Sequence, residues 1–456
     1  MSGKYRGIHL TVILAKTAER FIARDLIAFL HTGKFGPDQW VFTPGLSARD
    51  LVTASVMFWI LAICTGNKIA AYLGDISGAF DRVYKDYLLA KLQASGIGAR
   101  YLNFLDAYLQ PRKAVVAVEG VISDEIEIAN TVFQATDLGP PLWNCHYEDA
   151  RRAVLEHGFT ETVFADDLNC DKCFSSTASD NAILGEMRDC QASLHDWGNA
   201  NQVAFDPAKE TFHILHRARP LGSDFKILGI TFDAKLLMEA ATCEIAAQAH
   251  TRLNSILRAR RFYPVGMVIW LYKSLVLSYV EVSTPAIYHA TDFAISSVDN
   301  VQDRFLLEME LSEETALCEF ALAPLVSRRD IAMMGLIHKV VLGLAPVQFS
   351  KYFWRAPSAQ FPRGLRAPHL RHDRQLHDPI DGSQCNMYCR SVFKLIYTYN
   401  LLPQLVVESK TVCSFQGTLH KALRHASDMG IREWPRLLSQ GARDLSVDRF
   451  QACFRR

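Results

Sequence analysis

Apolar positions in the first half of the chain follow two spacings, which predict a mixture of helices and strands. Helical spacing predicts helices over residues 22–30, 48–66, 84–94, 100–109, 142–156 and 181–202. Short apolar or alternating runs predict strands over residues 68–73, 113–119, 125–130, 160–174, 211–215 and 226–232. The run 160–174 is predicted to be a hairpin with Asp166 and Asp167 at its bend. The pattern therefore indicates the α+β class.

Beyond Ala234 the strand signals become sparse and apolar residues recur at helical spacing. This shift predicts a boundary after residue 235, followed by a helical region over 236–345. Residues 346–380 combine prolines with arginines and histidines, so we expect a basic linker there. A helical C-terminal module is predicted over 381–456.

Composition is that of a globular protein: 456 residues, of which 49% are hydrophobic and 21% are charged. The 11 cysteines have no repeating spacing, which favours a reducing compartment. Residues 346–456 hold 17 Lys and Arg against 8 Asp and Glu, whereas residues 1–345 hold 32 against 40. A basic segment can bind a polyanion and an acidic body can bind metal ions, although solvated surface charge explains the same counts.

No segment is predicted to cross a membrane. The apolar run 51–64 is shorter than the roughly 18 to 20 residues that a span needs. A later run, 270–288, is interrupted by Lys273 and Glu281, and the first ten residues lack the apolar core of a signal peptide. The predicted location is the cytosol or the nucleus.

Three carboxylates are candidates for chemistry. Asp75 follows an apolar strand, and Asp166 and Asp167 lie in the middle of an apolar hairpin, where a carboxylate is costly unless a positive group meets it. If the two strands are neighbours, Asp75 and Asp166 would form the oxygen cage that Mg²⁺ prefers. Such a cage can hold two metal ions about 3.5 to 4 Å apart for phosphoryl transfer. Taken separately, each acidic site is better explained as a turn former at the end of a strand.

Three sequence blocks together resemble a known family. They are DISGAFDRV at 75–83, FQATDLGPPLWN at 133–144 and FADD at 164–167. Their order and spacing are similar to those of reverse transcriptases, and the chain resembles the polymerase part of a non-LTR (LINE-like) retrotransposon over roughly residues 1–345. Weaker matches lie at 5–10, 44–47, 206–209 and 228–230. The resemblance implies a right-hand polymerase fold, with a palm and partial fingers over 1–235 and a thumb over 236–345.

This resemblance also assigns roles at the expected metal site. Asp75, Asp166 and Asp167, with Ile76 beside them, would bind two Mg²⁺ ions, for which Mn²⁺ could substitute. Lys209 would protonate the leaving pyrophosphate. A turn carboxylate remains the other interpretation of Asp167, and a solvated loop residue that of Lys209.

Further roles concern the nucleotide and the nucleic acid. Phe80 matches the aromatic that excludes a 2′-hydroxyl, Gln134 the polar residue near the incoming deoxynucleotide, and Arg6 a residue that grips its triphosphate. Core packing for Phe80 and surface charge for Arg6 remain open. An arginine cluster in the thumb-like region would contact the phosphates of an RNA template and DNA primer, or is simply a solvated helix face; its members are Arg252, Arg258, Arg260 and Arg261.

The chain departs from the family pattern at two places. Ala135 stands where the family usually has glycine, a residue that permits conformations unfriendly to a Cβ. Relatives also carry further fingers sequence before the block at Tyr5, so we expect partial fingers and no target cleavage by this chain. Three hypotheses follow: an RNA-directed DNA polymerase, a catalytically silent remnant that still binds nucleic acid, and a helical interaction protein with incidental acidic turns. Separation of Asp75 from Asp166 beyond side-chain reach would favour the third.

Two cysteine pairs have spacings that occur in zinc sites. They are Cys170 with Cys173 and Cys385 with Cys389. Neither is followed by a second pair at finger spacing, so we interpret all four as structural thiols.

Overall fold

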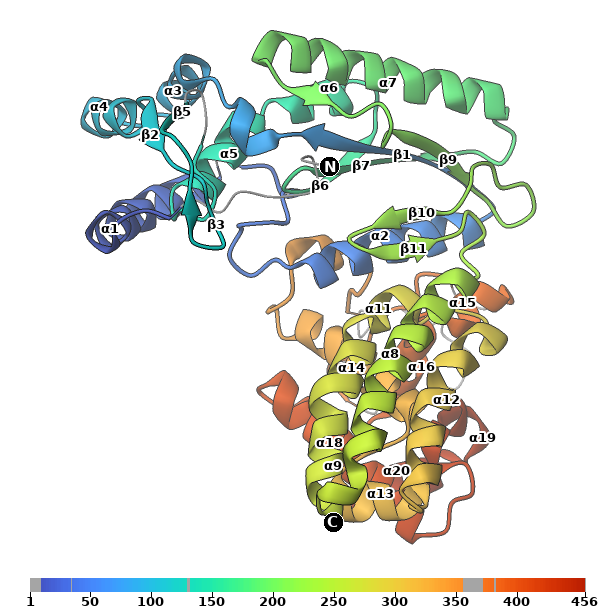
Figure 1. Cartoon of the computed structure of the whole chain (residues 1–456). Helices are drawn as coiled ribbons and strands as arrows, with labels where there is room; N and C mark the ends of the chain where they lie inside the picture. Colours follow the sequence, from blue (N-terminus) through green and yellow to red (C-terminus); the bar gives the residue numbers. More distant parts are fainter. Residues whose placement is uncertain (1–9, 34, 129–131, 356–371, 381–382, 456) are drawn as a thin grey trace. The chain divides into compact units, whose positions relative to one another are not determined.

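A computed structural model describes residues 10–33, 35–128, 132–355, 372–380 and 383–455 of the chain (Figure 1). The chain forms two compact units. Unit 1 holds residues 1–48 and 68–214, and unit 2 holds residues 49–67 and 215–456. The boundaries predicted after residues 235, 345 and 380 stay predictions.

A mostly antiparallel sheet forms the centre of unit 1. Its strands follow the order β6-β7-β1-β8, and β9 also pairs with β1. The bounds are β1 Lys68–Ser77, β6 Thr160–Phe164, β7 Asp167–Phe174, β8 Ala204–Phe205 and β9 Thr211–Leu215. The first half of β1 is buried on both faces, with Ile69 and Tyr72 fully covered, because this strand lies between neighbours and under a helix.

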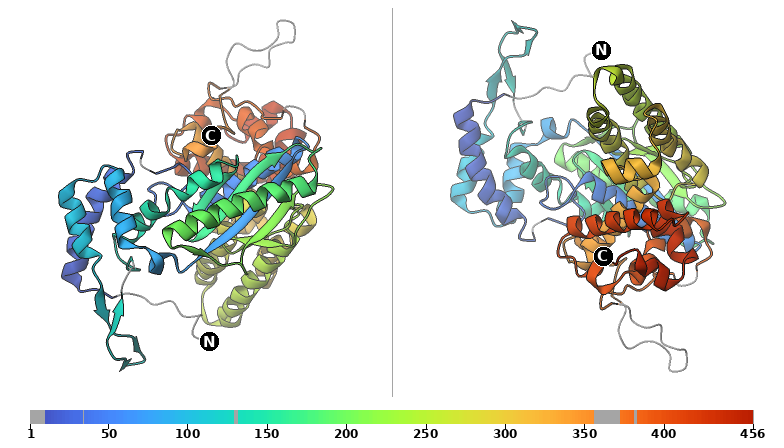
Figure 2. Two further views of the ribbon diagram at one scale, coloured as in Figure 1. Left: turned by 90° about the horizontal axis from the view of Figure 1, so that it is seen from above. Right: turned by 90° about the horizontal axis from the view of Figure 1, so that it is seen from below.

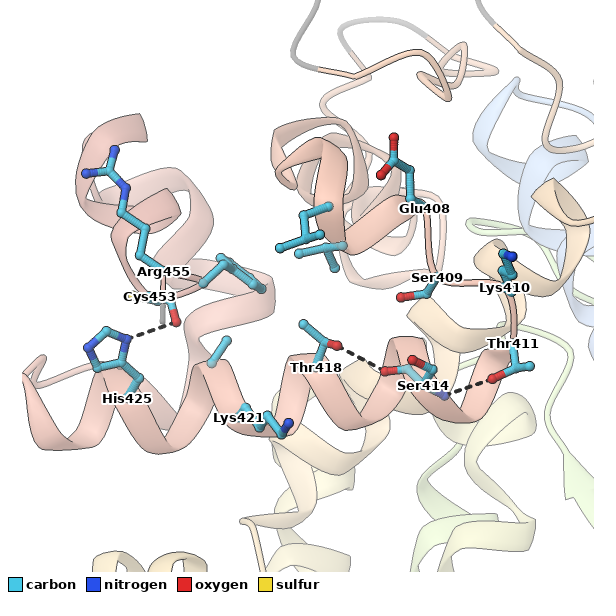
Figure 3. A pocket seen from close by; sticks show the side chains of 14 residues that line it. Glu408, Ser409, Lys410, Thr411, Ser414, Thr418, Lys421, His425, Cys453 and Arg455 are labelled. Atoms are coloured by element: carbon cyan, nitrogen blue, oxygen red, sulfur yellow. Dashed lines mark hydrogen bonds between the residues drawn. The ribbon is translucent and has the colours of Figure 1, made fainter.

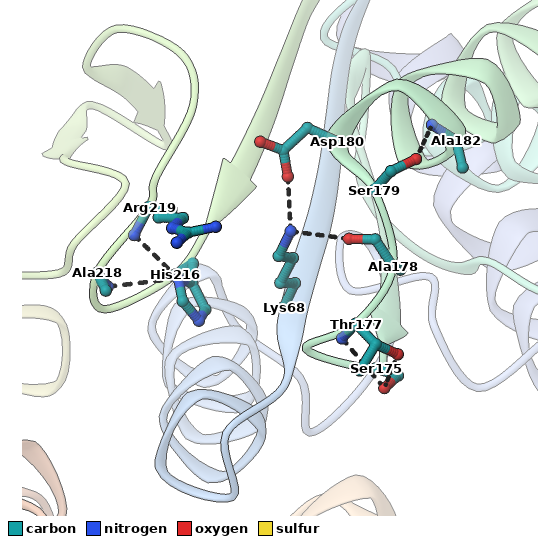
Figure 4. A network of polar contacts seen from close by, with 10 residues as sticks. All are labelled: Lys68, Ser175, Thr177, Ala178, Ser179, Asp180, Ala182, His216, Ala218 and Arg219. Carbon is teal, nitrogen blue, oxygen red and sulfur yellow. Dashed lines mark hydrogen bonds and ion pairs between the residues drawn. The ribbon is translucent and has the colours of Figure 1, made fainter.

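Two helices, α6 (Ala150–Leu155) and α7 (Asp180–Asn201), pack against each other and onto this sheet (Figure 1). The side chain of Ser179 caps α7 by accepting a hydrogen bond from the backbone N–H of Ala182 at 3.2 Å. Lys68, at the start of β1, donates to Asp180 Oδ1 at 2.6 Å and to the carbonyl of Ala178 at 2.8 Å (Figure 4). These two hydrogen bonds satisfy the largely buried ammonium group of Lys68 and fix β1 beside the start of α7.

The other helices of unit 1 lie beyond one end of the sheet (Figure 1). They are α1 Ile13–Leu30, the 3₁₀ helix η2 Ala79–Arg82, α3 Lys85–Ala94, α4 Ala99–Tyr108 and α5 Gly139–Tyr147. Glu19 of α1 is buried, and its Oε1 accepts from the backbone N–H of Leu138 at 2.8 Å and from the hydroxyl of Tyr108 at 2.9 Å. This carboxylate therefore joins α1 to the start of α5 and to the end of α4.

An exposed hairpin arm extends from these helices, and Figure 2 shows it in teal. The pairs are β2 (Arg112–Ala114) with β5 (Ile126–Ile128) and β3 (Ala117–Val118) with β4 (Val121–Ile122). Gly120, at φ 85°, makes the turn. The strand pair expected on either side of Gly120 is confirmed, although each strand is interrupted once.

Other predicted elements differ in detail. β1 continues to Ser77, so Asp75 lies inside the strand rather than after it, because pairing with β7 and β8 carries the strand past Gly74. The helix expected over 142–156 is two helices, α5 and α6, since the chain bends at Glu148 and Asp149. The single strand expected over 226–232 is a hairpin, because positive φ angles at residues 228 and 229 reverse the chain.

In unit 2, helix α2 (Ala48–Cys64) contacts the small hairpin of β10 (Phe225–Ile227) and β11 (Ile230–Phe232). The buried ring of Trp59 meets the rings of Phe225 and Phe232 edge-on, at centroid distances of 6.1 and 5.5 Å. Such edge-to-face contacts add to the burial of apolar surface. An aromatic cluster thus attaches α2 to residues more than 160 positions later.

Beyond Ala234 the described residues of unit 2 are mainly helical, as predicted. Helix α8 pairs with α12, and α14 pairs with α18 (Figure 1). The ring of Phe415 in α18 stacks on that of His338 in α14 at a centroid distance of 4.1 Å. The longer helices are α8 Glu239–Ala259, α9 Val265–Tyr272, α12 Asp292–Glu308, α13 Glu313–Phe320, α14 Leu325–Val341, α16 Lys394–Leu401 and α18 Val412–Asp428. The shorter ones are η3 Arg260–Phe262, η4 Lys273–Leu277, α10 Ser278–Val282, α11 Thr284–Ile287, η5 Val347–Phe349, α15 Asn386–Arg390, α17 Gln404–Val407, η6 Trp434–Arg436, η7 Leu437–Gly441, α19 Ala442–Asp444 and α20 Val447–Ala452.

One helical stretch among the described residues, Val265–Val282, is long and apolar enough to cross a membrane by length and composition, and 33% of it is buried. Its two charged residues are both paired inside unit 2: Lys273 donates to the carbonyl of Phe320, and Glu281 Oε1 accepts from Arg328 at 2.5 Å. Because both charged residues are paired within unit 2, we interpret the stretch as part of that unit.

Candidate functional site

The predicted carboxylates come together at one end of the β1·β7 strand pair. Asp75 lies directly opposite Asp167, and residues opposite each other in an antiparallel pair place their side chains on the same face. Asp166 occupies the two-residue turn between β6 and β7, and its carbonyl accepts from the N–H of Ile76 at 3.1 Å. The hairpin predicted over 160–174 is confirmed. The separation of Asp75 from Asp166 that would favour an interaction protein is not found.

The turn that carries Asp166 has a strained neighbour. Ala165 has φ 62°, a conformation that two-residue hairpin turns usually give to glycine or asparagine. Trp143, fully buried in α5, donates its indole N–H to the carbonyl of Ala165 at 3.0 Å. The bond holds the turn in place from outside the hairpin, which fixes the position of the backbone at Asp166.

Lys209 reaches the same place from the segment after β8. Its Nζ lies 2.6 Å from Asp75 Oδ2 and 4.0 Å from Asp206 Oδ2. The hydrogen bond to Asp75, together with the nearby negative charges, raises the pKa of Lys209 above its ordinary value. Asp206 supports the arrangement, because its N–H donates to the carbonyl of Asp75 at 2.9 Å. The site thus already holds one positive charge against Asp75.

The chemistry of these donors suits a hard cation, since carboxylate oxygens are what Mg²⁺ and Mn²⁺ prefer. Asp75 and Asp167 supply such groups from facing positions, and Asp75 already binds a cationic side chain. Over the described part of the chain, no three His, Cys, Asp or Glu side chains lie close enough together to hold a metal ion. The metal roles of Asp75, Ile76, Asp166 and Asp167 stay predictions.

Phe80 lies in η2, just after β1, and is half-buried. Its ring meets those of Trp143 and Phe42 at 5.9 and 6.4 Å, and its carbonyl accepts from the N–H of Val132 at 2.9 Å. This hydrogen bond links η2 to the residue that leads into the 133–144 block. The role of Phe80 beside a sugar stays a prediction.

The block at 133–144 forms a tight turn before α5. Gln134 is half-buried, and Ala135 is exposed with φ 61°. Alanine therefore occupies here the left-handed conformation that glycine adopts without cost. Farther along, a Cβ on Gly139 would lie only 2.6 Å from the carbonyl oxygen of Phe133, so this glycine is required by space.

The predicted nucleic-acid contacts divide into two groups. Arg252 donates to the carbonyl of Leu275 at 3.1 Å, and Arg260 pairs with Glu308 at 2.9 Å. Arg258 and Arg261 are exposed at the end of α8 and in η3. Arg6, predicted to grip the triphosphate, lies outside the described residues.

One buried and one half-buried acid, Glu161 and Glu148, carry no predicted role. Burial raises the pKa of Glu161 to about 8. Burial likewise raises the pKa of Glu148 to about 7. The hydrogen bond that its Oε1 accepts from the N–H of Gly36 at 2.8 Å offsets part of this rise. Alternation marks position 161 as inward-facing, so a glutamate there was the signal that sequence reasoning could have used.

Unit 2 holds a basic cavity of about 750 Å³, which sequence reasoning also missed. It lies between α18 and the last residues described, and Figure 3 shows Lys410, Lys421 and Arg455 around it. His425, also in its wall, donates a hydrogen bond from Nδ1 to the carbonyl of Cys453 at 3.2 Å. The charge agrees with the basic balance of residues 346–456, and the residues come from segments too far apart to form a sequence motif.

The two cysteine pairs do not behave alike. Cys170 is buried in β7 while Cys173 is exposed, so packing explains only the first. The Cys389 thiol donates to the carbonyl of Ser383 at 3.7 Å. Cys385 contacts a different thiol, that of Cys64, at 3.2 Å.

Comparison with known proteins agrees with the motif resemblance. The chain is 26% identical over 309 residues to the probable RNA-directed DNA polymerase from transposon BS of Drosophila melanogaster, covering 59% of this chain and 33% of the relative. It is 24% identical over 290 residues to the corresponding protein of transposon X-element from the same organism, covering 59% and 32%. The chain thus spans about a third of the length of these curated relatives. No family model matches.

Similar solved structures include apo telomerase from Candida tropicalis, with a TM-score of 0.37 and 8% identity over 74% of this chain and 57% of that one. Telomerase from Candida albicans in complex with a TWJ fragment of telomeric RNA has a TM-score of 0.35 and 9% identity, over 67% and 56%. The sequence relatives confirm the predicted resemblance to RNA-directed DNA polymerases of transposons.

Proposed function

We propose that this chain, a relative of transposon RNA-directed DNA polymerases, is itself the polymerase part of such an enzyme. The observation that carries the proposal is the pairing of Asp75 with Asp167, with Asp166 in the adjoining turn. In this proposal the sheet of unit 1 is the palm, the helices at its end are partial fingers, and the helices over 236–345 are the thumb. The substrates are an RNA template, a DNA primer and deoxynucleoside triphosphates.

The carboxylates would hold the divalent ions of the reaction, with Ile76 contributing from the backbone beside Asp75. Bound Mg²⁺ or Mn²⁺ ions supply charge stabilisation at the attacking and leaving oxygens of phosphoryl transfer. The chain positions the donors rigidly, because Asp75 and Asp167 are held by strand pairing and Asp166 by a turn that Trp143 supports. Primer elongation by attack of the 3′-hydroxyl on the α-phosphate is the reaction that this arrangement supports.

Lys209 would serve in two states. With no nucleotide bound, its ammonium group neutralises Asp75 at 2.6 Å. Asp75 would also hold a divalent ion, and Lys209, once its ammonium group leaves Asp75, can donate a proton to the leaving pyrophosphate. The hydrogen bond to Asp75 is the main cause of the raised pKa of Lys209, so the lysine stays protonated for as long as that contact lasts.

Phe80 and Gln134 are the proposed contacts to the incoming deoxynucleotide, and Arg6 the contact to its triphosphate. Both Phe80 and Gln134 are half-buried on segments that flank α5, so each keeps part of its surface for a ligand. The exposed Arg258 and Arg261 are proposed to contact phosphates of the template and primer, with Arg252 and Arg260 nearby.

Primer extension on an RNA template with deoxynucleotides and Mg²⁺ or Mn²⁺ tests the polymerase proposal. We expect extension by the wild-type chain and a loss of at least a hundredfold in the double variant Asp166→Asn, Asp167→Asn, because the isosteric amides cannot neutralise metal charge. Asp86→Asn, an exposed residue of α3, is the control and should keep wild-type activity. Extension that persists in the double variant would refute the assignment.

The phosphate contacts have a separate test in the salt dependence of primer-template binding. Replacing both Arg258 and Arg261 with alanine should reduce the slope of log K against log salt by about 2, since each phosphate contact contributes about one unit. An unchanged slope would remove this pair from the interface.

A catalytically silent protein that still binds nucleic acid is the second candidate. Ala135 favours it, because alanine holds a conformation of positive φ at the place where the family has glycine. Binding of a primer-template duplex with a normal salt slope, combined with no extension by folded wild-type chain, is the result that would select this candidate.

A further inference from the structure

Two thiols far apart in the sequence are in contact within unit 2. The sulfur of Cys64, the last residue of α2, lies 3.2 Å from the sulfur of Cys385, which immediately precedes α15. The two residues are 321 positions apart. Both side chains are partly exposed, so a small oxidant can reach them.

The surroundings of the two sulfurs differ, which gives each a different reactivity. Burial alone would raise the pKa of Cys385, but hydrogen bonds from the backbone N–H groups of Tyr388 and Met387 and from the Cys64 thiol outweigh it and lower the pKa overall. The Arg217 guanidinium acts in the same direction. Burial and the contact with Cys385 raise the pKa of Cys64. Cys385 is therefore the better nucleophile, and Cys64 keeps its proton.

We propose that Cys64 and Cys385 form a peroxide-sensitive dithiol, in which Cys385 reacts first and Cys64 resolves it to an intramolecular disulfide. The Cys385 thiolate attacks one oxygen of hydrogen peroxide, the O–O bond breaks, and a sulfenic acid forms while the departing hydroxide takes a proton to become water. The Cys64 sulfur then attacks the sulfenic sulfur, the S–O bond breaks, and the oxygen leaves as a second water with the Cys64 proton. Two thiols are oxidised by two electrons, and one peroxide is reduced to two waters.

A second thiol contact in the molecule serves as an internal comparison. Cys170 in β7 shares a side-chain hydrogen bond with Cys190 in α7, and both are fully buried. Burial is the largest of the causes that raise the pKa of Cys170 well above its ordinary value. Contact between sulfurs is thus common to both pairs, but access and thiolate character belong only to the pair of Cys64 and Cys385.

Oxidation would have a defined covalent consequence. A bond between residues 64 and 385 closes a ring that contains Asp75, Asp166 and Asp167, and it ties the end of α2 to α15. Because a crosslink over a long segment restricts mainly the unfolded chain, the oxidised protein should be the more stable form. A reducing compartment keeps the pair open, and peroxide closes it until a dithiol reductant restores the thiols.

The test uses the reduced full-length chain treated with graded hydrogen peroxide, followed by thiol blocking, digestion and mass spectrometry. We expect a crosslinked peptide that joins Cys64 to Cys385, formed before any product of Cys170 or Cys190, and a rise of several degrees in the thermal unfolding midpoint. In Cys64→Ser the crosslink should disappear and a sulfenic acid at Cys385 should be trapped by dimedone. Cys389→Ser, four residues along the same segment, is the control and should still form the crosslink.

A measurement on the wild-type chain makes the test independent of how the variants fold. Alkylation by iodoacetamide at pH 7.5 should be at least fivefold faster at Cys385 than at the exposed Cys413. Equal or slower alkylation at Cys385 would overturn the proposal. So would peroxide treatment that oxidises other cysteines while Cys64 and Cys385 remain free.

Discussion

Replacing Ala135 with glycine should stabilise the protein, against the usual direction of this substitution. Ala135 is exposed and has φ 61°, and an L-residue in that region costs about 1 to 2 kcal/mol relative to a right-handed conformation. Glycine avoids this cost. It also gives the unfolded chain more conformational freedom, which lowers the free energy of unfolding by about 0.4 to 1 kcal/mol. The net gain in the free energy of unfolding is therefore about 0.5 to 1 kcal/mol, or roughly a two- to fivefold shift in the folding equilibrium.

Urea denaturation measured by tryptophan fluorescence would give this free energy. The matched control is Ala192→Gly, an exposed position in the middle of α7, where glycine should destabilise by about 1 kcal/mol. The same chemical change should thus act in opposite directions at the two positions. If the polymerase proposal holds, Ala135→Gly should also keep or increase primer extension, because the turn after Gln134 is then no longer strained.

Destabilisation by Ala135→Gly as large as that at Ala192 would refute the reasoning, since it would mean that position 135 does not have the positive φ on which the calculation rests. A gain in stability with a loss of extension would separate the two effects. It would show that the strain at Ala135 contributes to positioning Gln134 rather than impairing it.

The remaining predictions concern stability. Glu161 has a pKa of about 8 in the folded chain, against an ordinary value of 4.5. Between these two pH values the folded form binds a proton that the unfolded form has lost. The free energy of unfolding therefore falls by about 1.4 kcal/mol per pH unit as the pH rises from the lower value to the higher. In Glu161→Gln the urea midpoint should fall less steeply with pH. The difference should be clearest between pH 7 and 8, because Glu148, with its pKa of about 7, is largely ionised there. The control Glu156→Gln, at an exposed position, should keep the wild-type slope. Gly139→Ala should cost about 1 to 3 kcal/mol in a urea titration, because its Cβ would lie 2.6 Å from a backbone carbonyl oxygen that cannot rotate away. Gly185→Ala, with open space in α7, should stabilise instead, and equal effects of the two glycine substitutions would contradict the packing described.

Local pattern was enough to predict most elements that surround the site. The alternation over 160–174 predicted the hairpin because one face of each strand is buried, and helical spacing predicted α2 and α7 to within two residues. The end of β1 was placed too early, since Gly74 and Asp75 are poor strand formers and only pairing with β7 keeps them extended. Tertiary contact overrode local preference at the position where the first carboxylate lies.

The candidate site was predictable where residues follow one another in blocks and unpredictable where distant segments meet. Asp75 and Asp166 were paired in advance on the assumption that their strands are neighbours. The contact between Cys64 and Cys385, the burial of Glu161 and the basic cavity beside α18 depend on packing between segments that no local pattern connects. A residue type that contradicts its expected environment, such as glutamate at an inward strand position, was the one available signal.

The position of α2 has a consequence for synthesis of the chain. This helix has 11 buried residues, and Trp59 among them packs on Phe225 and Phe232, which are made more than 160 residues later. At a translation rate of about 5 to 20 residues per second, α2 leaves the ribosome roughly ten to thirty seconds before its partners exist. Throughout that interval a strongly apolar helix has no native surface to cover it, although the residues on both sides of it belong to the unit completed first. Nascent chains stalled before residue 225 should therefore bind chaperones through α2, and chains extended beyond residue 232 should release them.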